Sequence, residues 1–203
     1  MKFTTIAALM IALSSGAAVA GDLTVEAEGP AMASADGWDG LYIGAQIGRT
    51  SGDYRYQTDG HESATTITIG GFAGYNYTLD GGLLLGGEIA YAYGSGKDDG
   101  LDALEPMTLS VFDAKARVGF AADQLLVYAF GGVSSVTDTH DDESDAETGT
   151  FNGFNYGLGV DFNVTGSAFI GVEYIRRELT EDNDENDATL ASDSLALRVG
   201  TTF

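Results

Sequence analysis

Seven charged residues interrupt runs that are otherwise rich in apolar residues and glycine. They are Glu88, Asp113, Lys115, Arg117, Asp161, Glu173 and Arg198. Two carboxylates such as Asp161 and Glu173 could act together as a general acid and base, but no motif beside them would orient a substrate. Four acids against three bases are close to charge balance, although the whole chain is strongly acidic. We therefore expect a buried network of ion pairs, with a selective ion path as the alternative.

The two histidines, His61 and His140, are the other candidates for catalysis. Both have serines nearby in the sequence, so residue types alone leave a serine–histidine–acid arrangement open. These serines are Ser51, Ser63, Ser134 and Ser135. Neither histidine belongs to a local catalytic motif, and both fall in segments expected to be solvated loops. We predict that the protein is not an enzyme.

Acidic segments could bind metal ions through their oxygen atoms. Asp182, Asp184 and Asn186 alternate, and Asp193 follows eleven residues after the first, which partly matches an EF-hand calcium loop. Asp187 stands where that loop requires glycine, and Asp193 replaces its bidentate glutamate. We predict no specific metal site and no cofactor, but weak binding of divalent cations by the acidic segments together.

The composition limits the partners of the protein. The 203 residues include 31 acidic and 9 basic ones, and the net charge is -22. Nucleic acid is excluded as a partner, because a polyanion binds to a basic surface. Cysteine is absent, which excludes a disulfide framework. Apart from the N-terminus, no apolar run is long enough to cross a membrane as a helix.

The N-terminus has the pattern of a signal peptide. Lys2 gives a positive end, residues 6–13 form an apolar centre, and Ala18, Val19 and Ala20 form a cleavage site of small residues. We assign residues 1–20 to this signal, residues 21–37 to a flexible lead-in and residues 38–203 to one exported domain.

The last ten residues, 194–203, alternate between two faces. Leu195, Leu197 and Val199 lie on one face, Arg198 lies on the other, and the chain ends in the aromatic Phe203. An apolar face backed by a small or charged one suits a wall between lipid and a polar interior. The stretch resembles the C-terminal signal that the barrel-assembly machinery reads in outer-membrane barrels. The last strand of a soluble sandwich is the alternative for this stretch alone.

Seven further segments show the same period of two. They cover residues 41–48, 65–77, 83–93, 112–120, 125–136, 154–162 and 168–176. Leu109 and Val111 fall out of phase with the segment that follows them, which predicts a β-bulge. Segment 125–136 is apolar on both faces, so its faces stay unassigned.

The connections between these segments alternate in length. Long polar segments cover residues 50–63, 94–106, 137–149 and 177–193, and tight turns cover residues 78–82, 121–124 and 163–166. Strands joined in this way place every long loop at one end, and every tight turn and both termini at the other. The pattern predicts an all-β fold, an eight-stranded antiparallel transmembrane β-barrel with short periplasmic turns and long extracellular loops. The sheet must close, because lipid cannot hydrogen-bond an open edge.

Short stretches along nearly the whole mature chain carry a family resemblance. They include WDGLYIGAQIG (38–48), LLGGEIAY (84–91), AKARVGF (114–120), LVYAFGGV (126–133), GVEYIRR (171–177) and RVGTTF (198–203). On these residues the chain resembles the small outer-membrane β-barrel family of alphaproteobacterial surface proteins, itself similar to the transmembrane domain of OmpA and to OmpX. The resemblance implies an outer-membrane location and brings no catalytic or ligand residues.

These observations together favour a structural role. We expect a monomer in the outer membrane, with both termini in the periplasm, that presents acidic extracellular loops. Its expected partners are outer-membrane lipid and lipopolysaccharide, divalent cations at the acidic loops, and the assembly machinery during biogenesis. A narrow porin-like channel for ions or small solutes is the alternative, and an adhesin or surface enzyme is the third possibility.

Overall fold

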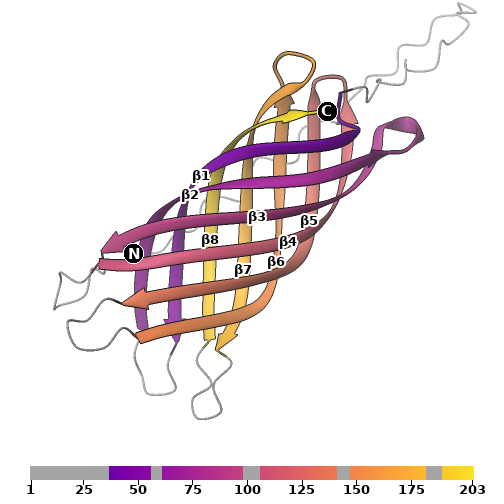
Figure 1. The fold of residues 1–203 in the computed structure, drawn as a ribbon. Coiled ribbons are helices and arrows are strands. Elements are labelled where there is room, and N and C mark those ends of the chain that lie inside the picture. The colour runs from indigo at the N-terminus through magenta and orange to yellow at the C-terminus, as the bar shows by residue number, and fades with distance from the viewer. Residues whose placement is uncertain (1–36, 56–60, 98–105, 141–146, 182–188) are drawn as a thin grey trace, which may run out of the picture. The chain divides into compact units, whose positions relative to one another are not determined.

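The computed structural model describes residues 37–55, 61–97, 106–140, 147–181 and 189–203. In these residues, eight strands form one antiparallel sheet that closes into a barrel (Figure 1), which confirms the predicted fold class. The strands are β1 (Gly40–Arg55), β2 (His61–Thr78), β3 (Leu83–Lys97), β4 (Pro106–Ala122), β5 (Leu125–His140), β6 (Glu147–Asn163), β7 (Ala168–Glu181) and β8 (Thr189–Thr202). The predicted signal peptide and nearly all of the predicted lead-in lie outside the described residues.

Each strand pairs with the next along the chain, and β8 pairs with β1 to close the sheet. This seam runs without interruption from Tyr42 opposite Thr202 to Arg55 opposite Thr189. A short 3-10 turn, η1 (Asp80–Gly82), connects β2 to β3. The described residues contain no helix with the length and hydropathy of a membrane span.

The two faces of the wall differ in polarity, as the period of two predicts. Large apolar side chains such as Ile43, Leu197 and Val199 point outward and are about half exposed. Inward side chains are buried and are mainly aromatic, charged or small. The faces of β5, which the sequence leaves open, are assigned by burial, because Tyr128 points inward and Val133 points outward.

The long loops of the sequence prediction are wrong in extent, because all eight strands continue past their apolar segments. The segments between strands at this end are only residues 56–60, 98–105, 141–146 and 182–188. A strand that leaves the lipid band meets water on its outer face, so polar residues replace the apolar ones there and the alternation that marks the strand disappears.

The predicted β-bulge is also wrong. Pairing of β4 with β3 and with β5 is continuous through Leu109 and Val111. Both side chains are buried inside the barrel, on the same face as Asp113. The phase change reflects a change in the barrel interior, which is charged at its centre and apolar nearer to the connecting segments 98–105 and 141–146.

Candidate functional site

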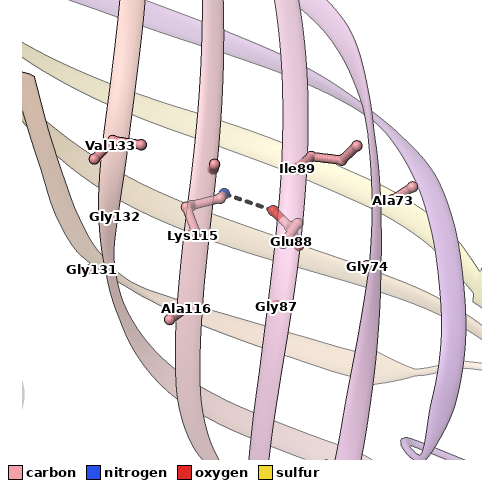
Figure 2. A pocket seen from close by; sticks show the side chains of 11 residues that line it. Ala73, Gly74, Gly87, Glu88, Ile89, Lys115, Ala116, Gly131, Gly132 and Val133 are labelled. Atoms are coloured by element: carbon pink, nitrogen blue, oxygen red, sulfur yellow. Dashed lines mark ion pairs between the residues drawn. The ribbon is translucent and has the colours of Figure 1, made fainter. Parts of the chain in front are cut away.

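Charged side chains from four strands meet inside the barrel. Glu88 on β3 lies opposite Lys115 on β4 in the sheet register. The Lys115 Nζ atom is 2.6 Å from Oε1 of Glu88 (Figure 2). The same Nζ atom is 2.7 Å from Oε1 of Glu173 on β7. Arg198 on β8 binds the same two acids, with Nη2 2.5 Å from Oε2 of Glu88 and Nη1 on Oε2 of Glu173. Each carboxylate is therefore shared by at least two cations.

Arg117 and two tyrosines extend this network. The Arg117 Nη1 atom is 3.0 Å from Oε2 of Glu88 and donates a hydrogen bond to the Tyr42 hydroxyl, which itself donates to Glu88. The Tyr128 hydroxyl donates to Glu173 at 3.0 Å. The Arg117 guanidinium also lies 3.9 Å from the centre of the Tyr128 ring, in reach of a cation–π interaction. These side chains are all buried, so their positions are fixed by one another.

Asp161 is the most weakly paired member of the predicted charge set. Its Oδ2 atom is 3.5 Å from Nη2 of Arg117, and its Oδ1 atom has no hydrogen-bond partner among the described residues. Gly171 on the next strand makes room for this carboxylate, because a Cβ atom at Gly171 would lie 1.9 Å from Oδ1 of Asp161. The structure thus places all seven predicted charges inside the barrel, and six of them in or beside one cluster.

Asp113, the seventh, belongs to a second ion pair that sequence reasoning missed. Arg177 donates to both carboxylate oxygens of Asp113, at 2.9 and 2.7 Å, and both residues are buried. The Ser134 hydroxyl also donates to Asp113. With Arg177 included, the buried interior holds four acids and four bases among the described residues. Glu173, Ile175 and Arg177 alternate along β7 and all point inward, so continuing this alternation by one more step would have identified Arg177 as an interior charge. The sequence prediction instead begins a loop at residue 177.

Apolar side chains close the interior on both sides of the charged centre. Near the loop-bearing end, six buried residues form one cluster: Leu109, Val111, Val136, Phe151, Leu179 and Leu190. At the tight-turn end, Trp38 is buried and its ring lies 5.8 Å from that of Phe169. The Trp38 Nε1 atom donates to the carbonyl of Asp123, and its own carbonyl accepts from Asn76. Trp38 therefore caps the barrel interior at the tight-turn end.

Inward glycines allow the large rings to fit in a narrow barrel. A Cβ atom at Gly159 would lie 2.1 Å from the Tyr128 ring, and one at Gly74 would lie 2.2 Å from the Tyr42 hydroxyl. The two tyrosines of the charge network thus each lie over a glycine of a neighbouring strand. An eight-stranded barrel has an interior just wide enough for side chains, and these glycines determine where the rings can lie.

The outer wall beside the ion pairs is formed mainly by small residues. A shallow hollow of about 550 Å³ extends across β2 to β5, where the outward positions include Ala73, Gly87, Ala116 and Gly131 (Figure 2). The exposed Ile89 and Val133 also border it. Most of its lining residues are at outward positions, and the buried Glu88 and Lys115 also border it.

The structure describes only part of the remaining catalytic candidates of the sequence. His61 and His140 are end residues of β2 and β5, and their side chains lie outside the described part of the chain, as does that of Ser63. Ser134 points into the barrel and binds Asp113. Ser51 contacts Thr65, and Ser135 lies opposite Phe112 and Asn152.

The calcium-like spacing is only partly described. Asp182, Asp184 and Asn186 lie outside the described residues. Asp193 is on β8, where it accepts hydrogen bonds from Tyr174 and Arg176. The proposed assembly-signal residues Leu195, Leu197, Val199 and Phe203 are all exposed on the outer surface.

Comparisons with known proteins agree with this architecture. A family model described as outer membrane protein beta-barrel domain matches residues 5–203. The 31 kDa outer-membrane immunogenic protein of Brucella melitensis is 28% identical over 212 residues, which cover 89% of this chain and 88% of that protein. Neisserial surface protein A superposes with a TM-score of 0.58 at 17% identity, covering 81% of this chain and 98% of that one. OprG from Pseudomonas aeruginosa superposes with a TM-score of 0.52 at 12% identity, covering 83% of this chain and 98% of that one. At these identities the two solved structures indicate a shared fold alone.

Proposed function

This chain belongs to the family of outer membrane protein beta-barrel domains, and from that premise we propose that it is a non-conducting, structural barrel of the outer membrane. It spans the membrane as a monomer, carries out no catalytic step, and presents its acidic, loop-bearing end to the outside of the cell. Lipopolysaccharide and the divalent cations that bridge anionic groups are its neighbours there. The exposed Leu195, Leu197, Val199 and Phe203 are the signal for the assembly machinery.

The observation that carries the non-conducting role is the filled interior. A channel needs water beside its charged groups, whereas Glu88, Lys115 and Arg198 are each at most 6% exposed. Their charges are neutralised by one another at contact distance. An ion that entered would have to break several buried pairs, at a cost of about 3–5 kcal/mol for each partner removed. Apolar clusters on both sides of the network add further barriers.

A planar-bilayer recording on the purified, folded protein tests this role. We expect no stepwise conductance above that of the protein-free bilayer, with a general diffusion porin reconstituted in the same way as the positive control. Reproducible unitary steps that scale with protein concentration would favour the narrow-channel alternative and require the ion pairs to open.

The asymmetry of the two ends supports the proposed orientation. Connections at the turn end are as short as residues 123–124, and outer-membrane barrels place their short turns in the periplasm. Because the chain has no cysteine, a single introduced thiol is a unique label. On intact cells a large maleimide should label Thr150→Cys, which is exposed near the loop end. It should label Thr165→Cys, in an exposed turn, only after the outer membrane is permeabilised, and the opposite pattern would reverse the orientation.

A further inference from the structure

The outward surface has a sharp boundary between its apolar band and the polar strand ends. Going toward the loop-bearing end, the first polar outward residue on β2 to β6 is always uncharged: Thr65, Ser95, Ser110, Ser135 and Asn152. On β7, β8 and β1 it is Arg176, Asp193 and Arg49. These three strands are adjacent because β8 closes the barrel against β1. Charge at the first polar positions on the loop-bearing side of the apolar band is therefore confined to one sector of the barrel among the described residues.

Within this sector Arg176 is paired with acids, whereas Arg49 has no ion-pair partner among the described residues. Arg176 lies 2.8 Å from Asp193, and Tyr174 donates a hydrogen bond to the same carboxylate. Asp193 is therefore compensated. Arg49 is exposed, lies opposite the apolar Leu195 and Ile67, and has no ion-pair partner among the described residues. A cation with apolar neighbours at the edge of a lipid band is placed to meet the phosphate of a lipid headgroup.

A groove lies on the other side of Asp193. It has a volume of about 480 Å³ and is lined by Phe154, Arg176, Glu178, Thr180, Thr189 and Ala191, together with their neighbours. Phe154 is 72% exposed and offers a flat apolar face. Carboxylate, guanidinium and hydroxyl groups surround it, which is the mixture of aromatic face and hydrogen-bonding groups that suits a sugar ring. Arg49 on β1 and Arg176 on β7 are two strand spacings, or about 10 Å, apart across the sheet. They are also offset by two residues along the strands, because Leu195, which is opposite Arg49, is opposite Tyr174.

We propose that this sector binds a phosphorylated glycolipid of the outer leaflet. A phosphate of the headgroup binds to Arg49, a sugar ring lies in the groove against Phe154, and the acyl chains follow the apolar surface of Ile47, Leu195 and Leu197 below. This site rests on the proposed function in one respect, because the loop-bearing end must face the leaflet that contains the glycolipid.

Native mass spectrometry of the folded protein in detergent, titrated with lipid A that carries both phosphates, measures the interaction directly. Removing one basic group near a phosphate surface should weaken binding about fivefold, so we expect that loss for Arg49→Gln. The matched control Ser95→Ala changes a first polar residue in the uncharged sector and should bind like the wild type. Fully dephosphorylated lipid A should bind wild type and Arg49→Gln equally. Equal binding of lipid A by Arg49→Gln and the wild type would overturn the phosphate contact.

Two further arms separate the parts of the proposal. Phe154→Ala should weaken binding of phosphorylated and dephosphorylated lipid A alike, and unchanged binding would remove the sugar from the groove. Millimolar inorganic phosphate should not displace lipid A, and efficient displacement would reduce the site to a general anion contact. The binding assay in detergent does not depend on membrane orientation. A reversed pattern of cell labelling would thus overturn the proposed orientation, while the effect of Arg49→Gln on lipid A binding could still be measured.

Discussion

Two consecutive arginines do different things in this barrel. Arg177 binds Asp113 in the interior, whereas Arg176 binds Asp193 on the outer surface. Successive side chains of a strand point to opposite faces, so one position along the chain separates a buried structural cation from a surface one. The sequence shows the two residues side by side, and only the strand boundary decides their roles.

At the scale of single residues, Arg198 has the largest predicted effect. Arg198→Met removes a cation shared by Glu88 and Glu173 and leaves both carboxylates buried with one partner fewer. We expect the free energy of unfolding to fall by about 3–5 kcal/mol, measured by urea titration in lipid vesicles. The matched control is Arg49→Met on the neighbouring strand, which removes an exposed arginine and should change stability by less than about 0.5 kcal/mol. Equal stability of the two variants would mean that Arg198 is solvated.

The elements of the fold were predictable as far as they lie in lipid. Segments such as 65–77 and 168–176 show both faces in their residue types, and the structure assigns those faces in the same way. The strand ends that lie in water lack the alternation of apolar and polar residues. The sequence prediction therefore places Arg177 and Leu190 in a loop, although they belong to β7 and β8. The incorrect β-bulge at Leu109 and Val111 has a different cause. The barrel interior is apolar near the loop-bearing end, so these inward residues have the residue types expected of a lipid-facing surface.

Alanine substitutions of strand glycines test how tightly the strands pack around the interior side chains. Gly159→Ala should lower the free energy of unfolding by about 1–3 kcal/mol, because its Cβ atom would overlap the Tyr128 ring and overpack the core. Gly131→Ala is the matched control in a neighbouring strand, since the nearest atom to its Cβ would be 3.9 Å away. We expect the control to be neutral or slightly stabilising. Urea titration of the two variants side by side compares them, and a loss at Gly131 as large as that at Gly159 would refute the packing argument.

On the scale of the whole molecule, closure is the property that no single strand possesses. The interior charges come from β3, β4, β6, β7 and β8. The ion pairs that cross the barrel, Glu88 with Arg198 and Lys115 with Glu173, form only when the sheet is complete. Sequence periodicity predicts eight strands, but which acid meets which base depends on the register of pairs that are distant in the chain, such as Glu88 and Arg198.

Trp38 is the one tryptophan of the chain, and its burial depends on closure. It contacts Asn76 from β2, Asp123 from the β4–β5 turn and Phe169 from β7, and these groups surround it together only in the finished barrel. During folding from urea into lipid vesicles, its emission should shift to shorter wavelength in the same step as the appearance of the heat-modifiable form on gels. Asn76→Leu, which removes the hydrogen bond to the Trp38 carbonyl, should leave the barrel folded but make Trp38 easier to quench with acrylamide. An emission shift that precedes the heat-modifiable form would mean that Trp38 is buried by local contacts before the seam between β8 and β1 closes.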